Sequence, residues 1–345
     1  MRARVFPLLL SVILVLGLVL GSSGKAQAEP VEISLGYVTA VGQLTPLIYE
    51  VHKLGALKHY GKTYTVNSLH FKGTSPMIPA MAAGQLDIGY LAFSSFANAV
   101  LNAKLPVRLL SDHMQTGPKS GFAFTWYALE KSAIKSVPDL RGKNVAINVA
   151  GAGVDLMLRA ALKKHGLDPA KDVNIVEVAF PNIEAMLREG KIDAGVLVSS
   201  FAMRALRRGG LHKVFAARDE IGGTQFVFPV VMESFLEKRL DVLADFLEDY
   251  LISLAWYRNP ANRDKAIDLA AAFTKQPRKT LEDWAFKPEW DYYRDPNGEP
   301  NLEVLQKNIN LLAEMKFIKE SFDVKKYVDL RPLRKAQARF QALKK

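Results

Sequence analysis

The fold is decided by a stretch that occurs twice, first as Gly84-Gln85-Leu86-Asp87-Ile88-Gly89-Tyr90-Leu91-Ala92-Phe93-Ser94-Ser95-Phe96-Ala97. It returns one residue shorter as Gly190-Lys191-Ile192-Asp193-Ala194-Gly195-Val196-Leu197-Val198-Ser199-Ser200-Phe201-Ala202. A Pro-x-Ile-x-Ala-Met segment precedes both copies. We predict in each copy a helix ended by its glycine, a short apolar strand buried on both faces, and a serine pair that caps the next helix. The repetition indicates two similar α/β halves, although any two α/β units share part of this pattern.

Two glycine-containing turns are candidate binding sites. The first, Gly73-Thr74-Ser75, precedes a predicted helix and presents two hydroxyls and free backbone N–H groups at its positive end. The alternative is that this turn only caps the helix. The second, Gly151-Ala152-Gly153, begins another helix and lets a ligand approach the backbone closely. Half of a dinucleotide-binding pattern is present there, but Leu156 replaces the third glycine, so NAD binding is not expected.

The N-terminus has the features of a secretory signal peptide. Arg2 and Arg4 precede an apolar run from Leu8 to Leu20, and Ala26-Gln27-Ala28 is typical of a cleavage site. We predict cleavage after Ala28, so that residues 1–28 are removed and the protein is exported to a bacterial periplasm. The alternative is an uncleaved membrane anchor.

Composition narrows the kinds of site that the chain can carry. Among the 345 residues there is no cysteine, which argues against lipid attachment, disulfides, thiolate metal sites and cysteine nucleophiles. The six histidines are scattered without metal-ligand spacing, so neither a metal nor another cofactor is expected. The net charge is +11, and its excess is concentrated in a basic helix predicted from Arg331 onward. We interpret this helix as a solvated surface rather than a nucleic-acid site, because an exported protein meets no genome.

Two glycine-rich segments mark the points where the chain crosses between the halves. They are Gly117-Pro118-Lys119-Ser120-Gly121 and the stretch from Gly209 to Gly223. Such segments can absorb the rotation of one lobe against the other. We therefore predict a discontinuous lobe 1 of residues 29–112 and 220–345, which includes the C-terminal helices, and a lobe 2 of residues 113–219.

Several motifs together resemble the NitT/TauT group of periplasmic substrate-binding proteins, the SsuA/THI5-like binders of nitrate, alkanesulfonates and taurine that are related to the pyrimidine-precursor binders. They are Val137-Pro138-Asp139-Leu140-Arg141-Gly142-Lys143, Ala83-Gly84-Gln85-Leu86-Asp87-Ile88-Gly89 and the ending from Asn301 to Asp329. The resemblance covers nearly all of the mature chain. It implies the α/β type II periplasmic-binding-protein fold, in which two α/β lobes are joined by a two-stranded hinge with a ligand cleft between them.

The resemblance also implies ligand contacts from both lobes. In lobe 1 they are Tyr37, Thr39, Gln43, Gly73, Thr74, Ser75, Phe93, Ser94 and Ser95, and in lobe 2 they are Gly151, Gly153, Ser199 and Ser200. Tyr37 and Phe93 could instead stack on an aromatic ring. This chain has Gly151-Ala152-Gly153 where the group usually has Gly-Ser-Thr, which removes hydroxyl donors from the predicted site.

The function that the resemblance implies is capture without chemistry. The chain would be the solute-binding component of an ABC importer, taking up a small polar or anionic organic molecule such as a sulfonate, a taurine-like compound or nitrate. Its expected partners are that small-molecule ligand and a cognate permease with its ATPase, with no nucleic acid, and a monomer is expected.

Two other classes of protein are alternatives to a solute-binding protein. One is a periplasmic enzyme on the same fold, either a lyase or dehydratase or a relative of the pyrimidine synthase. The synthase needs a cysteine-rich iron site, which a chain without cysteine cannot form, and no catalytic residues emerge from the sequence. The other is a ligand-sensing ectodomain, for which we identify neither a membrane span nor a signalling domain.

Overall fold

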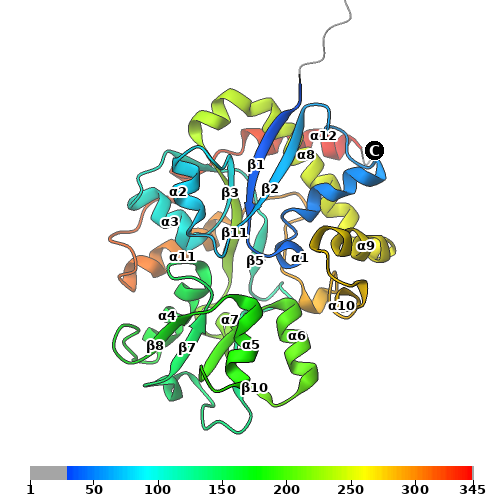
Figure 1. Ribbon diagram of the computed structural model, residues 1–345. Helices are drawn as coiled ribbons and strands as arrows, with labels where there is room; N and C mark the ends of the chain where they lie inside the picture. The colour runs from blue at the N-terminus through cyan, green and yellow to red at the C-terminus, as the bar shows by residue number, and fades with distance from the viewer. Residues whose placement is uncertain (1–28, 344–345) are drawn as a thin grey trace, which may run out of the picture.

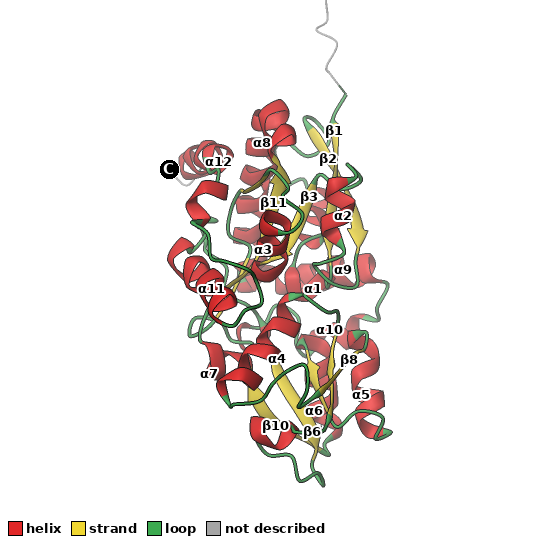
Figure 2. Ribbon diagram, turned by 90° about the vertical axis from the view of Figure 1, so that its left-hand side faces the viewer, coloured by secondary structure: helices red, strands yellow, loops and turns green. Residues whose placement is uncertain are grey.

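The computed structural model describes residues 29–343, with the backbone alone at positions 199 and 200. The predicted signal peptide, residues 1–28, lies outside the described residues. Two β-sheets organise the chain, one above the other along its long axis, and each is flanked by helices (Figure 1, Figure 2). We call the part around the six-stranded sheet lobe 1 and the part around the five-stranded sheet lobe 2.

The sheet of lobe 1 has the strand order β2-β1-β3-β11-β4, with β5 also paired to β11. Its strands are β1 (Val31–Tyr37), β2 (Tyr64–His70), β3 (Ile88–Ala92), β4 (Val107–Leu109), β5 (Met114–Thr116) and β11 (Thr224–Met232). The sheet of lobe 2 has the order β10-β6-β9-β7-β8. Its strands are β6 (Thr125–Leu129), β7 (Asn144–Ile147), β8 (Asn174–Glu177), β9 (Ala194–Leu197) and β10 (Leu211–Ala216).

The helices divide between the lobes in the same way. Lobe 1 carries α1 (Ala40–Gln43), α2 (Met77–Ala82), α3 (Phe93–Leu101), α8 (Glu233–Arg258), α9 (Arg263–Thr274), α10 (Arg278–Glu282), α11 (Leu302–Glu314), α12 (Arg331–Ala342) and the 3₁₀ helices η1 (Leu47–Leu54), η3 (Pro260–Asn262), η4 (Pro288–Trp290) and η5 (Val324–Tyr327). Lobe 2 carries α4 (Gly153–Lys164), α5 (Phe180–Arg188), α6 (Ser199–Arg208), α7 (Ala217–Ile221) and the 3₁₀ helix η2 (Val137–Leu140).

The two sheets share one topology. In lobe 1, β1 is parallel to β2 and β3, and β11 is antiparallel to β3. In lobe 2, β7 is parallel to β8 and β9, and β6 is antiparallel to β9. The repeat copies therefore supply equivalent strands, β3 and β9, which are buried along their whole length. Because Gly84 and Gly190 also both adopt φ of 68°, the predicted order of helix, glycine, buried strand and helix is confirmed in both copies.

The repeated aspartate has the same structural task in both lobes. Asp87 Oδ2 accepts a hydrogen bond from the backbone N–H of Ser34 in β1 at 2.8 Å. Asp193 Oδ2 accepts one from the backbone N–H of Asn144 in β7, also at 2.8 Å. Each carboxylate thus fixes the start of the repeat strand beside its parallel neighbour, which accounts for the matching Asp-x-Gly without any ligand.

The serine pair does not cap α3 as predicted. The residue with extended backbone ahead of α3 is Ala92, and no side chain caps the helix. Ser94 and Ser95 lie inside the first turn, where a hydroxyl is too far along the helix to occupy the capping position. The second pair, Ser199 and Ser200, begins α6, and the side chains of these two residues lie outside the description.

Two adjacent strands join the lobes, which confirms the predicted two-stranded crossing. β5 pairs antiparallel with β11, and the hydroxyls of Thr116 and Thr224 lie 2.8 Å apart. Just beyond them, Gly117 has a φ of 125°, and a Cβ there would come within 2.9 Å of the Cα of Gly223. Only glycine allows the two crossing segments of the chain to pass so closely. The lobe limits at residues 112 and 220 stay a prediction.

The basic C-terminal helix is attached along α8 in register. Arg331, Lys335 and Arg339 of α12 pair with Glu237, Asp241 and Asp245 of α8. The residue numbers rise together on both helices, so the two helices run parallel, and each basic residue lies one turn beyond the last. The charge that the sequence concentrates in α12 is therefore largely met by carboxylates of lobe 1.

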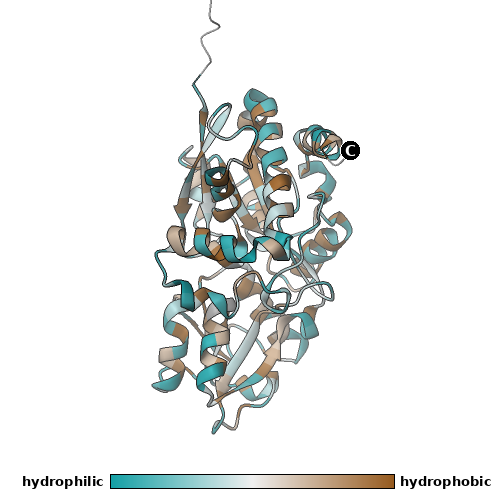
Figure 3. Cartoon of the chain, turned by 90° about the vertical axis from the view of Figure 1, so that its right-hand side faces the viewer, coloured by the Kyte–Doolittle hydropathy of each residue, from teal (hydrophilic) through white to brown (hydrophobic). Residues whose placement is uncertain are grey.

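Each lobe buries an apolar interior of its own strands and the inner faces of its helices, whereas hydrophilic residues dominate the outer helical faces (Figure 3). A second apolar cluster brings Met203 of α6 against Leu281 and Trp284 of lobe 1. Among the helices of residues 29–343, none combines the length and the apolar character that a membrane crossing requires.

Candidate ligand-binding cleft

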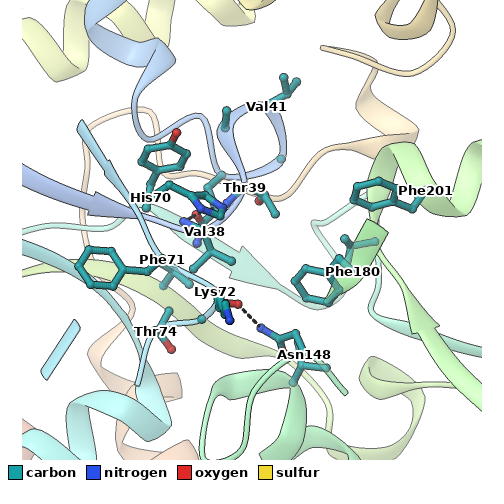
Figure 4. A pocket seen from close by; sticks show the side chains of 18 of the residues that line it. Val38, Thr39, Val41, His70, Phe71, Lys72, Thr74, Asn148, Phe180 and Phe201 are labelled. Atoms are coloured by element: carbon teal, nitrogen blue, oxygen red, sulfur yellow. Dashed lines mark hydrogen bonds between the residues drawn. The ribbon is translucent and has the colours of Figure 1, made fainter. Parts of the chain in front are cut away.

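A cavity of about 580 Å³ lies between the lobes. Lobe 1 contributes the ends of β1 and β2, the loop before η1 and parts of β11 and α9, whereas lobe 2 contributes the starts of α4, α5 and α6. In Figure 4 the side chains of the two lobes face one another across this space. Since a guest in such a cavity would touch both lobes, the cavity can couple binding to their relative position.

The loop after β1 forms the first wall. Tyr37, Thr39 and Gln43, which the family resemblance implies as ligand contacts, all line the cavity, and their contact with a ligand stays a prediction. The Gln43 side chain is buried, and its Oε1 accepts hydrogen bonds from the backbone N–H groups of Val38 at 2.7 Å and Thr39 at 2.9 Å. Gln43 therefore holds the shape of this wall with its side-chain oxygen, at the end of the short helix α1.

Buried polar groups support this loop from behind. His113 Nε2 lies 2.6 Å from the carbonyl oxygen of Gln43, and Arg294 donates to the carbonyl oxygen of Gly42 at 2.9 Å. Burial lowers the pKa of His113 well below its usual range, so the imidazole is neutral at physiological pH. Both residues position the wall and neither lines the cavity.

The turn after β2 forms the second wall. Gly73 and Thr74 line the cavity, but the Thr74 hydroxyl is engaged with Ser95 Oγ at 2.7 Å. Ser75 Oγ lies 3.3 Å from the same Ser95 oxygen. Ser75 and Ser95 stand behind Thr74 and do not line the cavity, so this hydroxyl cluster connects the starts of α2 and α3.

The remaining predicted residues occupy different places. Phe93 is buried in the core of lobe 1, outside the cavity wall. Gly153 lines the cavity at the start of α4, where a Cβ would come within 2.5 Å of the Phe226 ring. Gly151, with a φ of 70°, forms the turn just before. The predicted contacts of Ser199 and Ser200 fall on side chains outside the description.

The lobes touch one another on the rim of the cavity. Ser94 Oγ donates to the carbonyl oxygen of Gly151 at 3.2 Å, and Asn148 Nδ2 donates to the carbonyl oxygen of Lys72 at the same distance (Figure 4). On the opposite rim, Arg207 of α6 pairs with Asp283, which follows α10. The structure therefore represents a conformation in which the two lobes are closed on each other.

The charge of the cavity wall is slightly positive. Lys72 is the sole Lys or Arg among the described lining residues, and none of them is Asp or Glu. The sequence leaves open whether Asp155, at the start of a predicted helix, reaches the cleft or only stabilises the helix N-terminus. In the structure it accepts from the Gly151 N–H at 2.8 Å and from Arg159 at 2.7 Å, and burial raises its pKa. Since it does not line the cavity, Asp155 serves the start of α4.

Sequence reasoning missed the aromatic share of the wall. It includes Phe71, Phe124, Phe180, Phe201, Phe226, Phe273, Trp284 and Tyr292. Trp284 and Tyr292 belong to an aromatic loop that the sequence suggests would only pack on its own lobe. The sequence offered one signal for this aromatic wall, namely Phe180-Pro181 at the start of α5, just before the second repeat copy. The other rings come from separate elements that only the fold brings together.

Comparisons with known proteins agree with this architecture. The model of the NMT1-like family matches residues 26–271. The Escherichia coli (strain K12) protein named "Putative aliphatic sulfonates-binding protein" is 24% identical over 192 residues, which cover 54% of this chain and 55% of that protein. The chain thus spans about half the length of the curated relatives it matches.

Solved structures match over a larger share of the chain. The alkanesulfonate-binding protein SsuA from Xanthomonas axonopodis pv. citri, bound to MOPS, has a TM-score of 0.68 at 18% identity, covering 88% of this chain and 99% of its own. The periplasmic nitrate-binding protein NrtA from Synechocystis PCC 6803 has a TM-score of 0.70 at 15% identity, covering 91% and 89%. These matches confirm the predicted two-lobed α/β fold.

Proposed function

Because this chain belongs to the NMT1-like family, we propose that it is the solute-binding component of an ABC importer, acting in the periplasm. It would capture a small organic anion or polar molecule and deliver it unchanged to a membrane permease that is driven by an ATPase. The observation that carries this proposal is the cavity between the lobes. Residues of both lobes line it, and hydrogen bonds between the lobes lie on its rim.

The cavity wall favours binding over catalysis. The described lining residues include no pair of carboxylates for general acid and base work, and their hydroxyl and amide groups are largely engaged in holding the wall, as Gln43 and Thr74 are. The three relatives described above are named as binding proteins, which supports the same choice.

Closure is the step that would connect binding with transport. A ligand shifts the equilibrium between open and closed lobes only as far as it binds the closed form better. A guest that touches Tyr37 of lobe 1 and Phe180 of lobe 2 together meets this condition, because the second contact is absent when the lobes separate. The permease would then recognise the closed form.

A binding screen with a chemical readout tests this proposal. We expect calorimetry on the mature protein to find a sulfonate, carboxylate or nitrate ligand, and the same ligand to stabilise the fold by about 2.7 kcal/mol at a hundredfold excess over its dissociation constant. Mass spectrometry after prolonged incubation should recover that ligand intact. Conversion to a product would favour an enzyme on this fold, and a screen without any ligand would remove the support for a transport role.

A further inference from the structure

We propose that the ligand of this cavity is an aromatic acid, with a flat ring system enclosed by aromatic side chains and a single carboxylate or sulfonate near Lys72. This inference rests on the proposed function and specifies the chemistry of its guest. It narrows the expectation of a small polar or anionic organic molecule, for which the sequence left stacking on an aromatic ring open.

The deep wall of the cavity is a set of rings that hold one another in place. The ring centroids of Phe124 and Phe226 lie 4.7 Å apart, and those of Phe124 and Tyr292 lie 5.7 Å apart. All three residues line the cavity, and Phe124 also packs edge-on against Phe122 behind it. Because neighbours fix these rings, they form an apolar surface that is already arranged for a flat guest.

Lobe 2 supplies aromatic groups to the facing wall. Phe180 at the start of α5 and Phe201 in the first turn of α6 point into the cavity, opposite the strand ends of lobe 1 (Figure 4). Trp284 extends the wall from the lobe 1 side. A ring between these walls would be enclosed on both faces when the lobes close, so the apolar area removed from water would itself favour closure.

The polar groups gather at one end of the cavity. Tyr37 and His70 are paired residues of β1 and β2, and both end their strands at the cavity. Lys72 follows two residues later and forms no ion pair with any described carboxylate. Burial raises the pKa of Tyr37, so its hydroxyl stays protonated and can donate a hydrogen bond. The Lys72 ammonium and the Tyr37 hydroxyl, at this end of the cavity, suit a ligand with one acid group.

Size and charge exclude the smallest anions as a good fit. A volume of about 580 Å³ lies within the range of roughly 300–1,000 Å³ that is typical for drug-sized ligands. Nitrate or taurine would leave most of the ring surface uncovered, and an apolar wall offers such an ion no hydrogen bonds. An aromatic monoacid uses both the rings and the cationic end.

The test is calorimetry on the mature protein with five probes: 2-naphthoate, 2-naphthalenesulfonate, neutral 2-naphthalenemethanol, ethanesulfonate and nitrate. We expect at least one naphthyl acid to bind tenfold or more tightly than both small anions and the neutral alcohol. The two acids distinguish carboxylate from sulfonate.

Two variants assign the contacts. Lys72→Met should weaken the better naphthyl acid about tenfold and change the alcohol less than twofold, whereas the control Lys171→Met, at an exposed lysine outside the cavity lining, should change neither. Phe201→Leu keeps an apolar side chain and should weaken every naphthyl probe severalfold without affecting ethanesulfonate.

Each other outcome overturns a defined part of the inference. If ethanesulfonate or nitrate binds as tightly as the naphthyl acids, the aromatic ligand class is wrong while the transport proposal stands. If the alcohol equals the acids, or Lys72→Met affects all naphthyl probes alike, the acid group is wrong. If none of the probes binds, the inference fails, and the broader screen decides separately whether the transport proposal fails with it.

Discussion

Gly73 and Val149 face each other across the cleft at a distance that leaves no room for another methyl group. A Cβ built on Gly73 would lie 2.9 Å from Val149 Cβ and 3.0 Å from its Cγ2. Gly73 belongs to the turn after β2 in lobe 1, and Val149 follows β7 in lobe 2. The absence of a side chain at Gly73 therefore matters for the contact between the lobes more than for the local backbone.

We expect Gly73→Ala to weaken ligand binding about tenfold, which corresponds to about 1.4 kcal/mol, because the added methyl group keeps the lobes slightly apart. The measurement is calorimetry with the ligand found in the screen. Val149→Gly in the same chain removes the opposing Cβ and should restore most of the affinity, while Val149→Gly alone should bind nearly as the wild type does. Equal affinity of Gly73→Ala and wild type would contradict this role.

Single residues also show how far the sequence could lead. The glycines at 84, 117 and 190 were predictable, because helix ends and crossings select residues that adopt positive φ. The repeated glycines 89 and 195 were visible only as a pattern. Their reason is spatial, since a Cβ at Gly89 would come within 2.5 Å of the Met81 sulfur, where α2 packs on β3. Likewise, the roles of Ser94 and Ser95 depend on partners in distant turns.

At the scale of elements, α5 and α6 are held together by a buried carboxylate. The Glu184 side chain lies 3.0 Å from Arg188 Nε, 3.2 Å from Arg208 Nη1 and 3.6 Å from Arg204 Nε. It is only 3% exposed, so its charge is compensated by these guanidinium groups rather than by water. The two helices whose starts line the cleft are thus joined near their other ends.

Glu184→Gln should lower the free energy of unfolding by about 1.5 kcal/mol, because it replaces charge-assisted hydrogen bonds to the partly exposed guanidinium groups by neutral ones. Urea denaturation followed by circular dichroism provides the measurement. The control is Glu189→Gln on the same segment, where a half-exposed carboxylate pairs with Lys191 and a change below about 0.5 kcal/mol is expected. Similar losses in both variants would show that Glu184 acts as an ordinary surface charge.

Elements were the most predictable part of the fold. The sequence predicts a strand at residues 31–37, a helix that ends at residue 165, and helices at residues 236–257 and 302–315. Strand β1 has these bounds, and α4, α8 and α11 end within a few residues of them, because apolar periodicity and glycine stops are local signals. The sequence also predicts a helix from Pro46 to about Tyr60, with Gly61 as its stop. The structure has instead a 3₁₀ helix that ends at Leu54, before Gly55 with its φ of 70°. The aromatic wall was not predictable, since its rings come from the segment after β2, the residue before β6, β11, α5, α6, α9 and the loop after α10.

At the scale of the whole molecule, Asp112 connects segments that are far apart in sequence. Its Oδ1 accepts from Gln225 Nε2 of β11 at 2.6 Å, and its Oδ2 accepts from the backbone N–H of Asp295 at 2.7 Å. The residue follows β4, just before the chain crosses to lobe 2. The crossing strands and the C-terminal segment are therefore joined through one carboxyl group.

This carboxyl group should make stability depend on pH. Complete burial raises the pKa of Asp112 from 3.8 to about 6, so the protonated form is favoured in the folded protein. Its stabilising contribution is complete below about pH 4 and is lost as pH rises through about 6, a change on the order of 3 kcal/mol. The free energy of unfolding should be measured with urea at pH 3 and at pH 7. Between these pH values the wild type should lose about 3 kcal/mol more than Asp112→Asn does. If the difference in free energy of unfolding between the two proteins is the same at both pH values, the pH dependence assigned to Asp112 is wrong.

The register between α12 and α8 provides a site where a dye can be attached to measure lobe movement. Three ion pairs fix α12 against lobe 1, so an exposed alanine on it, such as Ala338, is a rigid mounting point. Because the chain contains no cysteine, Ala338→Cys and Ala170→Cys in lobe 2 would introduce the sole thiols for a donor and an acceptor dye. Energy transfer between the dyes would then report whether the two lobes of single molecules move apart and together.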